Sequence, residues 1–129
     1  MNRINFKREI AATLDQAVER VTQALAAQGF GILTRIDMHS KIKDKTDKEI
    51  IPTVILGACN PMLAYEAYTA NSDVASLLPC NAVIRELAPG KISVELAAPS
   101  AMMRILGDEN LVQLADAADK KIELALTQM

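Results

Sequence analysis

Residues 52–61, which read PTVILGACNP, decide the fold of this chain. The first eight residues form a short apolar run that predicts a β-strand ending at Cys59. Asn60 and Pro61 then supply the chemistry of a helix start. An Asn side chain caps free backbone N–H groups, and Pro is tolerated at the first helical position because an N–H there has no partner within the helix. We therefore expect a strand to lead directly into a helix at this point.

Upstream of this stretch, the sequence predicts a strand, a helix and a second strand. Residues 2–8 alternate apolar and polar side chains, as a half-buried strand does. Thr13 begins a helix as its N-cap, and Gln16 is placed to complete a capping box. Gly29 ends this helix, because glycine adopts the left-handed conformation without penalty. Residues 30–38 are apolar and β-branched, which favours the second strand.

The remaining segments predict a charged connection, a hairpin and a final helix. Residues 39–49 are dense in Lys, Asp and Glu, and we expect an exposed connection there with room for a helical turn. The helix that begins at Asn60 ends near residue 71. Residues 78–87 and 91–97 predict two strands joined by a tight turn. A last helix follows from about Asp108, with one apolar face.

This order of elements, β-α-β-β-α-β-β-α, predicts a single α+β domain over residues 1–129. Strands grouped between long helices favour two layers, with a mixed or antiparallel sheet and the helices packed on one face. The sequence contains no internal repeat and no Pro/Gly/Ser-rich linker that would divide the chain. One hydrophobic core suffices for a chain of this length.

Composition excludes several classes of function. The formal net charge is -2, no basic stripe is present and the chain contains no Trp, so a nucleic-acid partner is not expected. No apolar run approaches the roughly 20 residues of a membrane span, and residues 1–10 lack the apolar segment of a signal peptide. We expect a cytoplasmic protein without membrane contact. Its two cysteines are then free thiols.

Two Cys-Asn dipeptides, at residues 59–60 and 80–81, are the chemical oddity of the chain. Cys59 comes just before a helix N-terminus, where free N–H groups and the helix dipole stabilise a thiolate or a bound anion. If the two strand ends meet, both dipeptides face one pocket. The predicted ligand-binding residues are Cys59, Asn60, Pro61, Tyr65, Cys80 and Asn81.

Catalysis by these thiols would need further groups, and the candidate catalytic residues are Cys59, Cys80 and His39. His39 could act as the base for Cys59 with Asp37 orienting it, the arrangement of an activated nucleophile. The two cysteines and His39 could also hold zinc, but they are scattered in the sequence and no metal is predicted. The alternative for each residue is structural: buried cysteines behave as small apolar residues, Asn60 is explained by capping alone, and His39 is a surface histidine that opens the charged connection.

Four strings together resemble the family called domain of unknown function 302. They are ILGACNP at residues 55–61, LAY at residues 63–65, LLPCN at residues 77–81 and GFGILTRID at residues 29–37. The resemblance covers nearly the whole chain. It implies a compact α+β fold with a TATA-binding-protein-like arrangement and a homodimer. It implies no activity and no cofactor.

Three functions stay open at this point. The first is a module that binds a small ligand, with an anion as one possibility, around the two Cys-Asn dipeptides. The second is a thiol-dependent enzyme or redox sensor that uses Cys59 and Cys80. The third is an assembly or dimerisation subunit in which neither thiol matters.

Overall fold

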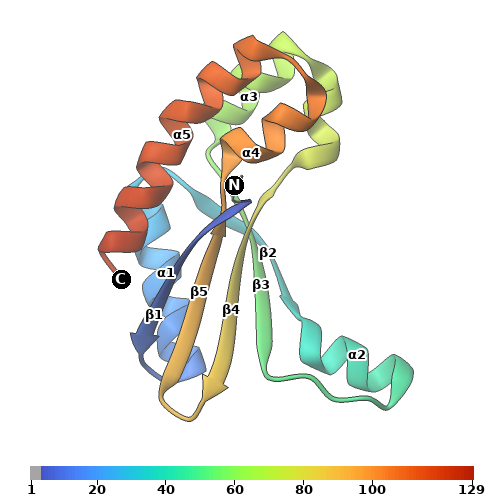
Figure 1. Cartoon of the computed structure of the whole chain (residues 1–129), viewed down its shortest axis with the longest axis vertical. Helices are drawn as coiled ribbons and strands as arrows, with labels where there is room; N and C mark the ends of the chain where they lie inside the picture. The colour runs from blue at the N-terminus through green and yellow to red at the C-terminus, as the bar shows by residue number, and fades with distance from the viewer. Residues whose placement is uncertain (1–3) are drawn as a thin grey trace.

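The structure is a computed structural model that describes residues 4–129. Figure 1 shows its elements, which in chain order are β1 (Asn5–Ala11), α1 (Leu14–Ala27), β2 (Gly31–Asp37), α2 (Met38–Thr46), β3 (Thr53–Cys59), α3 (Pro61–Ala70), the 3₁₀ helix η1 (Ser72–Leu77), β4 (Cys80–Ala88), β5 (Lys91–Ala97), α4 (Pro99–Met103), the 3₁₀ helix η2 (Arg104–Leu106) and α5 (Glu109–Thr127). Within these residues, no helix combines the length and apolar character needed to cross a membrane.

The strands form one five-stranded sheet in the order β1-β5-β4-β3-β2. All four neighbouring pairs are antiparallel. Gly90, at φ +80°, makes the tight turn between β4 and β5, because glycine adopts positive φ without steric cost. β3 lies between β2 and β4, so that Thr53–Cys59 occupies the interior of the sheet.

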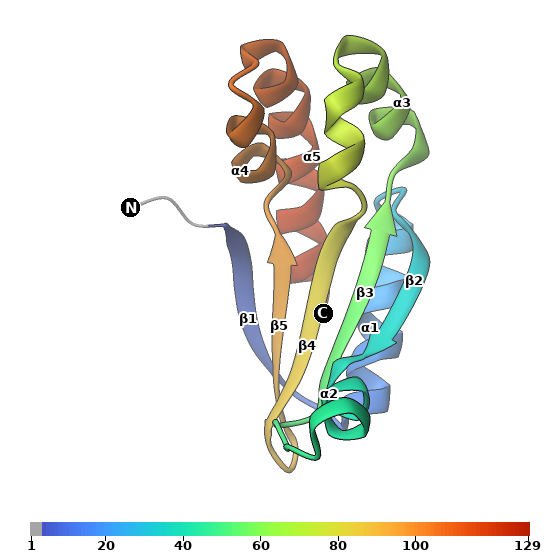
Figure 2. The same cartoon turned by 90° about the vertical axis from the view of Figure 1, so that its right-hand side faces the viewer.

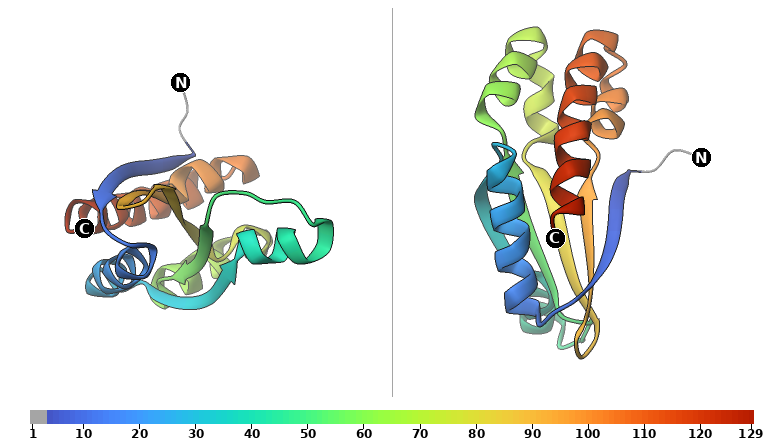
Figure 3. Two further views of the ribbon diagram at one scale, coloured as in Figure 1. Left: turned by 90° about the horizontal axis from the view of Figure 1, so that it is seen from below. Right: turned by 90° about the vertical axis from the view of Figure 1, so that its left-hand side faces the viewer.

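Helices cover one face of this sheet. α1 and the C-terminal half of α5 lie side by side on that face, as both views in Figure 3 show. α3, α4 and the N-terminal half of α5 extend beyond the end of the sheet (Figures 1 and 2). The two-layer α+β fold expected from the sequence is therefore confirmed, with a cap of short helices added at one end.

The other face of the sheet, seen in Figure 2, is not covered by any helix of residues 4–129, although α2 projects beside it. We call it the open face. Side chains alternate between the two faces of each strand, and the strand register assigns to the open face Lys7, Thr34, Ile36, Thr53, Ile55, Gly57, Asn81, Val83, Arg85, Ser93 and Glu95.

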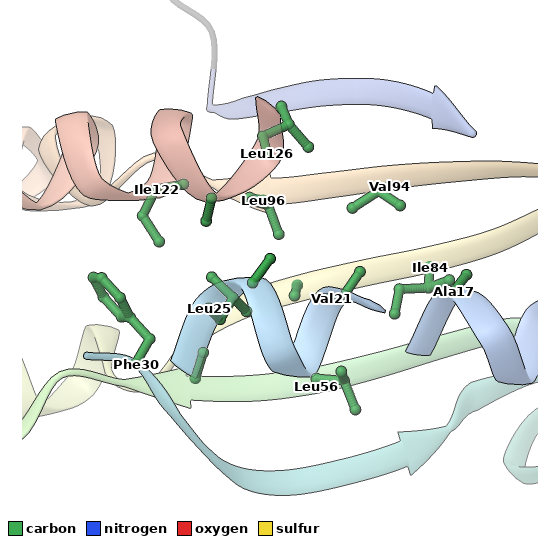
Figure 4. Packing of buried hydrophobic residues seen from close by; sticks show 14 of the residues in the cluster. Ala17, Val21, Leu25, Phe30, Leu56, Ile84, Val94, Leu96, Ile122 and Leu126 are labelled. Carbon is green, nitrogen blue, oxygen red and sulfur yellow. The ribbon is translucent and has the colours of Figure 1, made fainter. Parts of the chain in front are cut away.

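Buried apolar side chains form two clusters. The sheet cluster fills the space between the sheet, α1 and the end of α5 (Figure 4) and comprises Ile10, Ala12, Ala17, Val21, Ala24, Leu25, Phe30, Val54, Leu56, Ala58, Ala82, Ile84, Ile92, Val94, Leu96, Ala118, Ile122, Ala125 and Leu126. The helical cluster lies in the cap and comprises Ala67, Val74, Met103, Leu111 and Ala115. α5 is the element that contributes to both.

Several local predictions are confirmed. Thr13 Oγ1 accepts a hydrogen bond from the Gln16 N–H at 3.1 Å, and Gln16 Oε1 accepts one from the Thr13 N–H at 3.1 Å, which completes the capping box. Gly29 has φ +84° directly after α1. The side chain of Asp108 caps α5 by accepting from the Asn110 N–H at 3.0 Å.

Two segments differ from the sequence prediction. The predicted connection at residues 39–49 contains α2, a helix of 9 residues. No side chain of this helix is buried. Its charged residues are equally compatible with a solvated helix and a solvated loop, so the sequence shows no apolar stripe that would indicate a helix. The first strand begins at Asn5 and continues to Ala11, so it is shifted from the predicted residues 2–8. Residues 2 and 3 lie outside the described part of the chain.

Candidate functional site

Antiparallel pairing of β3 with β4 brings the two cysteines together. Ala58 lies directly opposite Cys80, and Cys59 is the next residue along β3. Both cysteines line one cavity at this end of the sheet. The sequence prediction that the two thiol-bearing strand ends meet beside the start of α3 agrees with this geometry.

The cavity lies where the sheet cluster and the helical cluster meet. It is lined by Phe30, Ala58, Cys59, Asn60, Leu63, Ala64, Ala67, Leu78, Cys80, Pro99, Met103, Leu111, Leu114, Ala115 and Ala118. The volume of the cavity is about 50 Å³, which exceeds the roughly 10–15 Å³ that one buried water needs. Cys59, Asn60 and Cys80 provide the polar side chains of an otherwise hydrocarbon wall.

Small side chains explain why this space is not filled. Five of the lining residues are alanines, and they come from β3, α3 and α5: Ala58, Ala64, Ala67, Ala115 and Ala118. Protein interiors are normally packed as densely as organic crystals. Alanine on three facing elements leaves a volume that neighbouring side chains do not reach.

Asn60 holds the entrance of α3 in place. Its Oδ1 accepts a hydrogen bond from the Leu63 N–H at 3.2 Å, as predicted for an N-cap. A Cβ at Gly29 would lie 3.1 Å from Asn60 Nδ2. Gly29 thus serves both the end of α1 and the close approach of this amide. Since Asn60 already occupies the helix N-terminus, that terminus is less available to an anion than the sequence suggested.

Burial changes the acidity of both thiols in the direction opposite to the one predicted. Desolvation raises the pKa of Cys59 above its ordinary value. Desolvation also raises the pKa of Cys80, to about 11, with smaller contributions from the nearby Cys59 and Asp119. For Cys59 this direction is opposite to the one expected from its place before the N-terminus of α3. Both thiols are neutral near pH 7.

Asp119 borders this site on the α5 side. Its Oδ1 accepts a hydrogen bond from the Ser100 N–H at 3.0 Å, and its Oδ2 accepts one from the Ser100 hydroxyl. The carboxylate therefore satisfies backbone and side-chain donors in the first turn of α4. Its charge disfavours a second negative charge on Cys80.

Three predicted ligand-binding residues lie away from the cavity. Asn81 is on the open face, opposite Gly57, whereas Cys80 faces the helices. Adjacent strand residues necessarily point to opposite faces. Tyr65 is 66% exposed on α3, and Pro61 is exposed at the first position of that helix. Cys59, Asn60 and Cys80 are the members of the predicted set that the fold brings together.

His39 is far from the cysteines. Its Nδ1 accepts a hydrogen bond from the Thr53 N–H at 3.0 Å, at the start of β3, whereas Cys59 ends the same strand. Six residues of strand separate the two by roughly 20 Å. Asp37 pairs with Arg35 at 3.1 Å instead of orienting His39. The candidate Cys-His pair therefore does not form, and the same distance excludes the three-ligand zinc arrangement with His39.

Sequence reasoning missed the far wall of the cavity. Met103 from α4 and Leu111, Leu114, Ala115 and Ala118 from α5 complete it. The apolar face of the last helix was predicted, but nothing in a periodic pattern indicates which part of a helix faces a void. The run of alanines in α5 was the available signal.

Fold and site together define a small α+β domain with a thiol-lined cavity between its sheet and its helical cap. The chain belongs to the family described as "Domain of unknown function DUF302", whose model matches residues 6–129. A solved structure described as an uncharacterized conserved protein DUF302 from Bacillus stearothermophilus is similar, with a TM-score of 0.91, 24% identity and 98% coverage of each chain. A comparison with curated proteins finds no match.

Proposed function

We propose that this protein binds a small, uncharged molecule in the cavity between the sheet and the helical cap. The observation that carries the proposal is a partly open, largely hydrocarbon cavity with Cys59, Asn60 and Cys80 as its polar groups. Binding sites for small molecules are typically concave and apolar, with a few polar groups that orient the ligand.

The ligand's charge follows from the wall of the cavity. Hydrocarbon side chains cannot compensate a buried charge, and an unpaired charge is costly to desolvate. The Leu63 N–H is taken by Asn60, and Asp119 adds a negative charge beside Cys80. An anion therefore fits poorly, and we replace the anionic ligand considered from the sequence with an uncharged one.

Thermal unfolding with a panel of small uncharged compounds tests this proposal. A compound at 100 times its Kd stabilises the folded state by about 2.7 kcal/mol. We expect some compounds to raise the Tm of the wild type but not that of Ala115→Leu, in which the added side chain fills the cavity. Ala117→Leu is the matched control, because Ala117 is exposed on the same helix. A panel that stabilises neither the wild type nor this control would overturn the proposal.

A second candidate role, assembly into a homodimer, is favoured by the open face. Ile36, Ile55 and Val83 are neighbours across three adjacent strands and form an apolar row in its middle. Beside them, Glu95 pairs with Arg85 at 2.6 Å and with Lys7 at 3.4 Å. A partner covering this face would bury an apolar row and charges that are already neutralised within the chain.

The size of the open face fits a second copy of the chain. Five strands of about seven residues span roughly 24 Å by 24 Å, or roughly 600 Å² per copy. Two copies would bury roughly 1,200 Å², the lower end of stable interfaces, before any contribution from α2. A row centred on Ile55 can meet its own copy across a two-fold axis, as isologous dimers require.

Light scattering tests this second role. We expect a dimer for the wild type and a monomer for Ile36→Arg, since this exposed position in the row tolerates a charge only in the free chain. Ile105→Arg, at an apolar position that is 69% exposed outside the open face, should stay dimeric. A wild type that is monomeric at high concentration, or an Ile36→Arg variant that stays dimeric, contradicts the role.

A further inference from the structure

Asn60 brings an amide of fixed orientation to the wall of the cavity. Its Oδ1 accepts the hydrogen bond from the Leu63 N–H at 3.2 Å, so capping decides which end of the amide is oxygen and which is nitrogen. Its Nδ2 lies beside Gly29, where a Cβ would come within 3.1 Å. Among residues 4–129, this NH₂ group donates to no protein acceptor. Its N–H groups are therefore free to bind a ligand.

The wall of the cavity offers hydrogen-bond donors and no free side-chain oxygen. The oxygen of Asn60 is the one side-chain oxygen in the lining, and it is already bonded. The raised pKa of Cys80 keeps its thiol protonated near pH 7, and a thiol S–H is a weak donor. Asp119 does not line the cavity, and its two oxygens accept from the N–H and the hydroxyl of Ser100. A ligand that needs a strong acceptor would find none among these side chains.

This one-sided supply of hydrogen-bonding groups selects among uncharged molecules. A carbonyl oxygen accepts from the Asn60 amide and brings no donor of its own. A hydroxyl or an amine also brings an O–H or N–H, which would be buried in hydrocarbon without an acceptor, and an unpaired buried donor weakens binding. A carboxylate would bring a charge that the hydrocarbon wall cannot compensate. The carbonyl group is the oxygen function that fits best.

We propose that the cavity selects a small, uncharged carbonyl compound without an O–H or N–H of its own, whose oxygen accepts a hydrogen bond from Asn60 Nδ2. The inference rests on the proposed function, because it names the class of ligand that the same cavity takes. The volume of about 50 Å³ has room for roughly three to five water-sized groups. The hydrocarbon part of such a molecule would contact the alanine and leucine side chains that α3 and α5 contribute to the wall.

Titration with acetone and with isopropanol tests the inference, because these two molecules share one carbon skeleton and differ only at the oxygen function. NMR spectra of the isotope-labelled protein give the Kd of each probe and follow the side-chain NH₂ group of Asn60 directly. We expect acetone to bind about fivefold more tightly than isopropanol, the value of one neutral hydrogen bond. Acetone should also shift an amide proton of the Asn60 side chain downfield.

Asn60→Asp separates the free donor from the helix cap. An Asp side chain also caps a helix, but it replaces the NH₂ group with an acceptor oxygen. The preference for acetone should be lost or reversed, since isopropanol can donate to a carboxylate. Asn71→Asp is the matched control, because Asn71 caps η1 by accepting from the Asp73 N–H at 3.0 Å and does not line the cavity. This control should keep the preference of the wild type.

The outcomes separate this inference from the proposed function. A preference for acetone that Asn60→Asp removes and Asn71→Asp keeps supports the inference. Equal affinities of the two probes for the wild type, or a preference that Asn60→Asp retains, overturn it and leave the proposed function standing, because the cavity then binds uncharged molecules without this selection. Binding of neither probe to the wild type also overturns the inference. The proposed function then depends on its own panel of compounds and on Ala115→Leu.

Discussion

The sheet cluster and the helical cluster differ in how completely their side chains fill the space between elements. The sheet cluster contains large aliphatic residues from four strands, such as Leu56, Ile84 and Val94, each at most 1% exposed. The helical cluster is smaller and includes Ala67 and Ala115 among its few buried members. The cavity lies where these clusters meet. The sheet cluster therefore supports the fold, while its boundary with the helical cluster leaves room for a ligand.

The largest effect should come from truncating the filled cluster. Leu56→Ala removes a fully buried side chain and should lower the free energy of unfolding by about 3 kcal/mol. Leu114→Ala, at the cavity wall, should lower it by about 1 kcal/mol, because that side chain is only partly buried and already borders empty space. Urea denaturation measures both values. Equal losses would show that the two regions are packed alike.

A smaller effect is expected at the boundary itself, where Asn60 caps α3. Asn60→Ala should cost about 1 kcal/mol, since the Leu63 N–H loses its acceptor. Asn60→Ser should retain most of this stability, because a Ser hydroxyl also caps a helix. Denaturation curves of the two variants decide the matter. If they lose the same stability, capping does not explain the residue.

The fold was largely predictable because its signals are local. The Asn60-Pro61 helix start, the capping box at Thr13 and the stop at Gly29 each depend on residues within a few positions of one another. Even the meeting of the two cysteines follows from the pairing of two predicted strands.

The errors concern features that the chain sets at long range. The exposed position of Asn81 depends on which face of β4 meets the helices. The helix α2 has no buried apolar stripe by which the sequence could indicate it. The distance between His39 and Cys59 depends on the direction of β3. The acidity of the thiols depends on burial by α4 and α5, which no motif near Cys59 encodes.

The smallest expected effect on the free energy of unfolding comes from Cys80. It is negligible near pH 7 and grows in alkaline solution. Its pKa is raised from 9.0 to about 11, so between these values the unfolded chain loses a proton that the folded chain keeps. Stability should therefore fall as the pH rises through this window. In Cys80→Ala this contribution is absent, and stability should fall less over the same range. Identical pH profiles for the two proteins would show that the thiol is not desolvated.

Alkylation rates measure the pKa of each thiol separately. Only a thiolate reacts rapidly, so a raised pKa predicts slow modification of both cysteines near pH 7. Cys80 should reach its half-maximal rate at a higher pH than an ordinary thiol does. A rate profile centred well below pH 9 at Cys59 would restore the thiol-enzyme interpretation.

The central claim is that an accessible apolar space exists beside the two thiols, and a crystal pressurised with xenon tests it most directly. Xenon enters apolar cavities and is easily located by its scattering. We predict one xenon atom between Cys80 and the Ala115–Ala118 segment of α5. A well-ordered crystal with no xenon there, and with side chains filling that volume, would contradict the account.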